Sequence, residues 1–209
     1  MSSAKEMIDY DHEYTYVINK LDINSDVINA WWYQDNLFSP EECDEIVRVG
    51  RENGLQSGYV MGEDGKGYEN LDYRVVGVNG IKPTPEHRWM FDRIGEAVAR
   101  ANRECWQYDI IGMREGLQFL EYENNGHYNW HKDVGQGWNS TRKLTAIIQL
   151  TDSDSYEGCD LELEGGIKLG RDRGSITIFP SYYSHIVHPH TGGEPRNSLA
   201  VWIYGPPLR

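Results

Sequence analysis

Long apolar runs and cysteine pairs are scarce in this 209-residue chain. No stretch reaches the roughly 20 consecutive apolar residues that a membrane-spanning helix needs. Residues 1–6 (MSSAKE) lack the apolar core of a signal peptide, so we expect a cytoplasmic protein without a membrane partner. Cys43, Cys105 and Cys159 are odd in number and show no CxxC spacing. This argues against a disulfide framework and a zinc–cysteine site, and predicts free thiols, two of them on helices.

Basic residues are also few, with 20 Lys and Arg against 33 Asp and Glu and a net charge of −13. Binding to a phosphate backbone depends on clustered Lys and Arg, so nucleic acid is not expected as a partner. The chain is 39% hydrophobic, and its length fits one sizeable domain better than two. Residues 1–28 are polar and acidic and are interpreted as a loosely anchored extension or edge segment. Residues 29–209 are expected to form a single domain.

Two helices are predicted in the first half of that domain. Residues 39–42 (SPEE) place a Ser cap before a Pro and a Glu, a capping box that opens a helix ending near Gly50. Residues 84–86 (TPE) are expected to open a longer helix. Its apolar stripe, suited to covering a sheet, consists of Met90, Ile94, Ala97, Val98, Ala101 and Cys105.

From Glu115 onward the apolar pattern has a period of two, which is typical of strands. The predicted strands are residues 117–122, 143–150, 160–164, 175–179 and 198–204. Helices followed by many strands favour a mainly β member of the α+β class, built as an antiparallel sandwich or jelly roll. Residues 62–70 (GEDGKGYEN) are too rich in glycine for regular structure and are interpreted as a mobile loop over the site.

The candidate chemistry begins at His131 and Asp133. On an extended strand these two positions face the same side, whereas Lys132 faces away. A third metal ligand is available from His185, His188 or His190, and His188 is the closest competitor of His185. Three such ligands would leave coordination positions open, as in non-haem Fe(II) oxygenases.

Each of these residues also has a simpler interpretation when it is considered alone. A His-x-Asp pair is most often a surface ion pair, and the segment 185–190 could form an exposed turn. Arg196 alone would be a solvated charge, and Tyr122 and Trp202 would be core aromatics with a polar tip. Their joint order along the chain is what favours a functional site.

From about Trp31 to Pro206 the chain resembles the iron(II)- and 2-oxoglutarate-dependent oxygenases, specifically the prolyl 4-hydroxylase-like branch. The segments that carry the resemblance are 37–43 (LFSPEEC), 126–133 (GHYNWHKD), 142–145 (RKLT), 149–152 (QLTD), 156–161 (YEGCDL), 174–181 (GSITIFPS), 185–189 (HIVHP) and 193–202 (GEPRNSLAVW). The resemblance implies a double-stranded β-helix with His131, Asp133 and His185 as iron ligands. It also implies Fe(II), 2-oxoglutarate and O2 as cofactors and cosubstrates, with ascorbate as a further candidate.

The resemblance assigns further roles to individual residues. Arg196 would bind the distal carboxylate of 2-oxoglutarate, which suits a planar guanidinium, and Tyr122 would also contact the cosubstrate. The remaining positions, on the substrate and iron side of the pocket, are Tyr128, Arg142 and Trp202.

Three departures from the family pattern stand out. Gln149 replaces a tyrosine that contacts 2-oxoglutarate in many prolyl hydroxylases, and it is the third candidate cosubstrate-binding residue beside Arg196 and Tyr122. Gly158-Cys159 replaces the usual Gly-Gly pair, and one extra residue is expected near Gly192-Gly193. None of these changes removes a ligand.

The leading hypothesis is a dioxygenase that hydroxylates a prolyl residue in a peptide or protein and releases succinate and CO2. One alternative of the same class acts on a free amino acid or another small molecule. Two alternatives come from other classes: a zinc hydrolase using the same three ligands, and a non-catalytic jelly-roll binding module.

Overall fold

The computed structural model describes residues 7–10, 13–16, 30–61 and 67–207. Most of the 1–28 extension and residues 62–66 of the glycine-rich loop lie outside this part of the chain. The division into an extension and one domain therefore stays a prediction. No helix in the described ranges is long and apolar enough to cross a membrane.

The strands and helices follow one another in an order that puts both helices before most of the sheet. The first half contains β1 (Met7–Tyr10), β2 (Glu13–Tyr16), β3 (Trp32–Gln34), α1 (Pro40–Arg51), β4 (Gln56–Ser57), β5 (Val60–Met61), β6 (Gly67–Tyr68), β7 (Arg74–Val75), β8 (Gly77–Ile81), α2 (Arg88–Cys105) and β9 (Gly112–Met113). The second half contains β10 (Leu117–Tyr122), β11 (His127–His131), a 3₁₀ turn (Gly137–Thr141), β12 (Arg142–Gln149), β13 (Tyr156–Gly158), β14 (Leu161–Leu163), β15 (Ile167–Lys168), β16 (Ile176–Pro180), β17 (His185–Val187), β18 (His190–Gly193) and β19 (Arg196–Tyr204).

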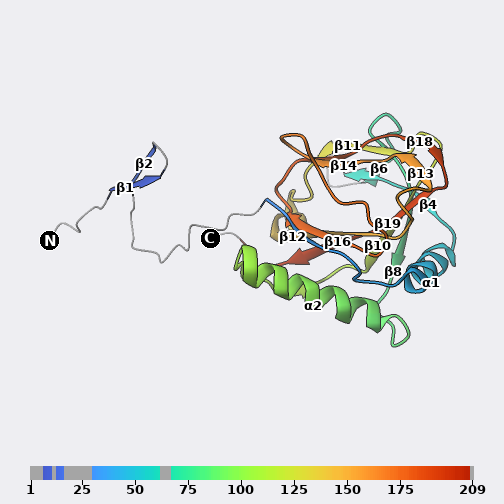
Figure 1. Cartoon of the computed structure of the whole chain (residues 1–209), viewed down its shortest axis with the longest axis horizontal. Coiled ribbons are helices and arrows are strands. Elements are labelled where there is room, and N and C mark those ends of the chain that lie inside the picture. Colours follow the sequence, from blue (N-terminus) through green and yellow to red (C-terminus); the bar gives the residue numbers. More distant parts are fainter. Residues whose placement is uncertain (1–6, 11–12, 17–29, 62–66, 208–209) are drawn as a thin grey trace.

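Two antiparallel sheets face each other. The larger has the order β3-β16-β12-β19-β10-β8-β4, with β9 beside β19, and the smaller has the order β15-β14-β17-β11-β7. Figure 1 shows α1 and α2 on the side of the larger sheet that is turned away from β11 and β14. The architecture is therefore a helix layer and two sheets, with antiparallel pairing between strands distant in sequence, as the sequence predicts.

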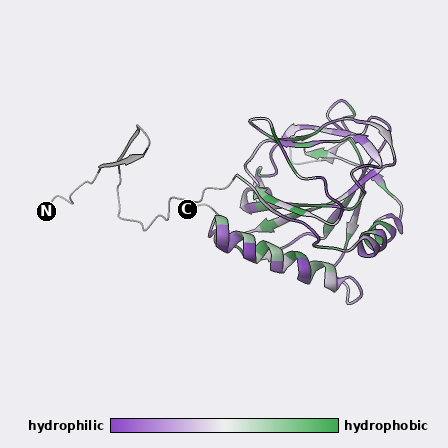
Figure 2. Cartoon of the chain, viewed as in Figure 1, coloured by the Kyte–Doolittle hydropathy of each residue, from purple (hydrophilic) through white to green (hydrophobic). Residues whose placement is uncertain are grey.

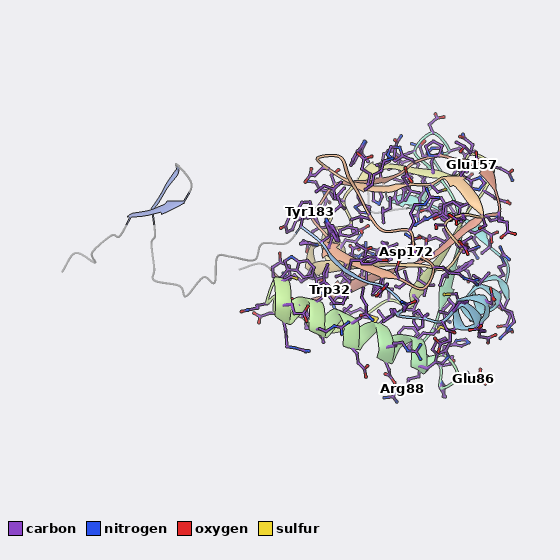
Figure 3. All side chains as sticks on the ribbon, in the orientation of Figure 1. Trp32, Glu86, Arg88, Glu157, Asp172 and Tyr183 are labelled. Atoms are coloured by element: carbon purple, nitrogen blue, oxygen red, sulfur yellow. The ribbon has the colours of Figure 1, made fainter. Side chains whose placement is uncertain are left out.

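Apolar side chains form two cores in this arrangement. One lies between the helices and the larger sheet and includes Ile46, Ile94 and Phe119. Purple and green segments alternate along α2 in Figure 2, as expected for a helix with one apolar face. The second core lies between the sheets and includes Leu163 and Phe179. Side chains occupy the space between the layers, and Trp32 marks the edge near α2 (Figure 3).

The capping signal of α1 is confirmed. Ser39 accepts a hydrogen bond from the backbone of Glu42, and the Glu42 carboxylate accepts one from the backbone of Ser39. The expected start of the second helix is wrong by several residues. Residues 84–87 form a turn in which the His87 N–H donates to the Thr84 carbonyl at 3.1 Å. The proline therefore lies in that turn, and α2 begins at Arg88.

The predicted strands all exist, with shifts at their ends. β10 has the expected bounds, whereas β19 begins at Arg196, two residues before the predicted strand of 198–204. The interpretation of residues 62–70 as wholly irregular is wrong in one part. Gly67 and Tyr68 form β6, and Tyr68 pairs with Val60 of β5. A pair this short tolerates glycine because it makes few ladder bonds.

Candidate metal centre

His131 and His185 come together across two paired strands. His131 ends β11 and His185 begins β17, and the two residues are direct partners in the antiparallel register. Their ring centroids lie 4.1 Å apart. Because both strands belong to the smaller sheet, which packs against the larger one, the two imidazoles point into the space between the sheets rather than into an exposed turn.

Asp133 reaches the same point from a bend and not from the strand that the sequence predicts. β11 ends at His131, and the Asp133 N–H donates to the Ser181 carbonyl at 3.1 Å. The carboxylate oxygens lie 3.8 Å from Nε2 of His131 and 3.6 Å from Nε2 of His185. The three potential ligand atoms are within 4.8 Å of one another, so one cation could contact all three.

Hydrogen bonds to the backbone fix which nitrogen of each ring faces the carboxylate. Nδ1 of His131 lies 2.7 Å from the Asn129 carbonyl, and Nδ1 of His185 lies 3.1 Å from the Tyr183 carbonyl. A carbonyl only accepts, so Nδ1 carries a proton in each ring and Nε2 is the nitrogen that faces the carboxylate. Orientation of a histidine by its second nitrogen is common in metal sites.

The electrostatics suit a metal-binding set. Burial, reinforced by His185, holds the pKa of His131 well below its ordinary value, so this ring is neutral at neutral pH. Burial opposes ionisation of Asp133, yet His185 and His131, with a 2.7 Å hydrogen bond from Thr145, keep its pKa below the ordinary value. Two imidazoles and one carboxylate are ligands that divalent iron accepts.

The competing histidines lie elsewhere. Nε2 of His188 is 2.9 Å from the Glu162 carboxylate, and 40% of its side chain is exposed. Nε2 of His190 is 3.0 Å from the Glu194 carbonyl. Among the described residues, the grouping that could hold a metal is His131, Asp133 and His185.

A pocket opens beside these three residues. Of the other residues singled out from the sequence, those that line it are Arg196, Tyr122, Tyr128 and Trp202. Arg196 is only 2% exposed, and its Nη1 atom has no hydrogen-bond partner among the described residues. A buried guanidinium with an unused donor fits an anion inside the pocket, such as a carboxylate of 2-oxoglutarate.

Two aromatic residues lie beside members of the site. The Tyr122 ring lies 5.3 Å from the Arg196 guanidinium, and the Tyr128 ring stacks on His131 with 3.4 Å between centroids. Burial raises the pKa of Tyr128 to about 12 and also raises that of Tyr122. Both phenols therefore keep their protons at neutral pH and can donate hydrogen bonds.

Gln149 and Arg142 support the pocket from behind its lining. Gln149 Oε1 accepts a 3.2 Å hydrogen bond from Nε of Arg196. The Arg142 guanidinium lies 3.8 Å from the Trp202 ring centroid and donates to the Asp133 carbonyl at 3.1 Å. Roles of these residues toward cosubstrate or substrate stay predictions.

The sequence interpretation missed three polar residues of the lining: Arg74, Gln118 and Ser198. Two of them could have been found by alternation along a strand. Ser198 follows Arg196 by two positions on β19, and Gln118 shares a face of β10 with Tyr122. Arg74 lies on the two-residue strand β7, which gives no such signal.

Comparisons with known proteins agree with this geometry. Residues 117–204 match the model of the 2OG-Fe(II) oxygenase superfamily. A PKHD-type hydroxylase of Teredinibacter turnerae is 34% identical over 94 residues, which cover 41% of this chain and 41% of the relative. The match thus spans about two fifths of that curated relative's length.

Solved structures show the same fold. A prolyl hydroxylase from Trichoplax adhaerens, in complex with a hypoxia inducible factor oxygen degradation domain peptide fragment, superposes with a TM-score of 0.69 at 15% identity, covering 85% of this chain and 84% of that one. A viral collagen prolyl hydroxylase from Paramecium Bursaria Chlorella virus-1, in a 2OG complex, gives 0.64 at 16% identity, covering 85% and 97%. The predicted double-stranded β-helix is therefore confirmed, as is the resemblance to 2OG-Fe(II) oxygenases of the prolyl 4-hydroxylase-like branch.

Proposed function

We propose that this protein, whose residues 117–204 match the 2OG-Fe(II) oxygenase superfamily, is an Fe(II)- and 2-oxoglutarate-dependent dioxygenase that hydroxylates a prolyl residue in a peptide or protein. The observation that carries the proposal is one pocket lined by the three candidate ligands and by a buried arginine with an unused donor. The prolyl substrate is supported more coarsely, by the names of the relatives.

In this proposal the chain's residues bind and orient rather than transfer protons. His131, Asp133 and His185 would hold Fe(II) and leave positions for the 2-oxo acid and O2. Arg196 would bind the distal carboxylate of 2-oxoglutarate, with the Tyr122 hydroxyl as a neighbouring donor. Bound Fe(II), 2-oxoglutarate and O2 together supply the oxidation that inserts one oxygen atom into a C–H bond and places the other in succinate, with loss of CO2.

The rest of the lining controls what reaches that centre. The apolar side chains among the lining residues are Leu120, Ile147, Leu161 and Val187. They would pack on the methylene groups of the cosubstrate and limit the water that enters. Tyr128 and Trp202 would flank the substrate, as the family resemblance implies.

The cytoplasmic location of the protein and the binding of ascorbate stay predictions.

A zinc hydrolase with the same ligands explains less of the site. Such an enzyme needs a metal-bound water but no anion site beside it, whereas Arg196 is buried in this pocket without an acidic partner among the described residues. A binding module that only kept the fold would likewise not require the hydrogen bonds that orient both histidines.

Anaerobic titration with Fe(II) and then 2-oxoglutarate tests the proposal. We expect a weak visible charge-transfer band from the chelate. Once O2 is admitted, succinate formation should rise when a proline-containing peptide library is added, with a 16 Da mass increase in the substrate. Arg196→Met should lose the band at 2-oxoglutarate concentrations that saturate the wild type. No band, together with no succinate for any peptide, would refute the proposed function. Hydrolytic activity supported by Zn(II) and unaffected by Arg196→Met would favour the hydrolase.

A further inference from the structure

Arg74 is a second buried arginine in the pocket of the candidate metal centre. It lies on β7 opposite Tyr128 of β11, and it is 8% exposed. Its guanidinium lies 4.5 Å from the centroid of the Tyr128 ring, which also stacks on His131. Arg74 is therefore adjacent to the metal-binding residues, although neither motif spacing nor the expected family roles assign anything to it.

The hydrogen bonds of Arg74 use only part of its capacity. Nη1 donates to the Tyr59 carbonyl at 2.8 Å and Nη2 donates to Gln118 Oε1 at 3.1 Å. Nε has no partner. A guanidinium carries five N–H donors, and both of the recorded acceptors are neutral. Within the described ranges no carboxylate pairs with Arg74.

The sum of the charges in the assembled site indicates that Arg74 lacks an anionic partner. In the proposed complex, the two negative charges of 2-oxoglutarate offset those of Fe(II). Asp133 offsets one of the two guanidinium groups, Arg74 and Arg196, that line the pocket. One buried positive charge is left, and an unpaired buried charge is costly unless an anion accompanies it.

We infer that Arg74 binds a carboxylate of the substrate, so that the substrate is a carboxylic acid whose charged group lies close to the carbon that is hydroxylated. This inference rests on the proposed oxygenase function and adds the chemical class of the substrate to it. The carboxylate belongs either to a free amino acid or to an acidic or C-terminal residue of a peptide.

A structural role for Arg74 makes a different prediction. If the side chain serves only to hold the Tyr59 carbonyl and Gln118, its loss weakens the binding of all substrates alike. If it binds a carboxylate, its loss removes the difference between an acid and the corresponding amide. The ratio between the two members of such a pair is therefore the informative quantity.

The experiment compares acids with their amides on the full-length protein. The probes are L-proline and L-prolinamide, N-acetyl-L-proline and N-acetyl-L-prolinamide, and proline-containing peptides with a free or amidated C-terminus or with Glu or Gln beside the proline. Binding is measured as the rise in melting temperature with Mn(II) and 2-oxoglutarate present. Turnover is measured as succinate and mass increase with Fe(II). We expect at least one acid to bind and react about tenfold or more better than its amide.

Three variants connect that preference to the side chain. Arg74→Met should reduce the acid-to-amide ratio to near one, and Arg74→Lys should keep part of it because the charge remains. The matched control is Arg88→Met, because Arg88 is exposed at the start of α2, on the outer side of the helix layer (Figure 3). It should keep the full ratio. The charge-transfer band with 2-oxoglutarate should persist in Arg74→Met.

The outcomes separate this inference from the proposed function. Absence of the band and of succinate in the wild type refutes the oxygenase itself. A band with equal binding of acid and amide in every pair, or with binding of neither member of any pair, overturns the role of Arg74. So does loss of the band in Arg74→Met, because the residue would then serve the cosubstrate. The free and peptide arms identify which source carries the carboxylate.

Discussion

Gln149 controls the orientation of Arg196 through one buried hydrogen bond at 3.2 Å. Gln149→Leu should remove that bond at nearly constant volume and weaken 2-oxoglutarate binding about fivefold, because a buried hydrogen bond contributes about 1 kcal/mol. Gln149→Glu should weaken binding further, because its carboxylate would pair with Arg196 and compete with the cosubstrate. Titration of the charge-transfer band measures both. Unchanged affinity in Gln149→Glu would contradict the role given to Arg196.

At the scale of single residues, the sequence predicts which residues form the candidate metal centre better than it predicts how they are arranged. His131 and His185 become cross-strand partners, which requires a pairing that no local pattern specifies. Asp133 was expected on a strand but is held in a bend by the Ser181 carbonyl, a long-range contact. Arg74 gave no signal because a two-residue strand has no periodicity.

The backbone conformation at Cys159 gives a physical reason for the glycine that the family usually has at this position. Cys159 has a φ of +53°, in the left-handed region that glycine adopts without strain. The family's usual second glycine at this position is thus explained by backbone conformation.

Nearby, the register between β13 and β18 shifts so that Gly158 pairs with His190 and Glu157 with Gly192. Thr191 is left over as a bulge, close to where the sequence suggests an extra residue.

At the scale of elements, local signals located the strands and the α1 cap but not the connections. The capping box of α1 involves residues three apart, so the sequence alone reveals it. Of the short strands of the smaller sheet, β7 depends on β11, a partner far along the chain, and β15 forms a hairpin with β14. A strand of two residues is too short to show a periodic pattern in the sequence. For this reason β7, the strand that carries Arg74, could not be predicted.

Glu42 connects the two helices, and its protonation should affect stability. Its carboxylate accepts a 2.5 Å hydrogen bond from Arg93 of α2. This bond lowers the pKa of Glu42 below 4.5, against a smaller opposing effect of burial. The contribution is therefore complete above pH 4.5 and is lost as the pH falls through the lowered pKa. Glu42→Gln, which keeps an acceptor for the cap, should cost about 0.5 kcal/mol at neutral pH.

Urea denaturation at several pH values measures this effect. The difference in unfolding free energy between the wild type and Glu42→Gln should shrink as the pH falls below 4.5. Glu86→Gln is the control, because Glu86 is exposed in the turn before α2 (Figure 3). A difference that stays constant with pH would show that the Glu42 carboxylate charge does not stabilise the helix pair.

At the scale of the whole molecule, the candidate centre joins residues that lie on different sheets. His185 lies on the smaller sheet, Asp133 is hydrogen-bonded to Thr145 of β12 in the larger sheet, and Arg196 begins β19 of that same sheet. A metal ion and 2-oxoglutarate bound between these residues would connect the two sheets. Ligands that bind only the folded state stabilise it by mass action.

We therefore expect Mn(II) and 2-oxoglutarate together to raise the melting temperature by about 5–10 °C at about a hundredfold excess over the dissociation constant, since that excess contributes about 2.7 kcal/mol. His185→Ala, or the isosteric Asp133→Asn, should abolish most of this rise. His188→Ala should keep it, because His188 pairs with Glu162 outside the centre. Thermal denaturation with and without ligands measures all four proteins. A rise that survives in His185→Ala and disappears in His188→Ala would reassign the third ligand.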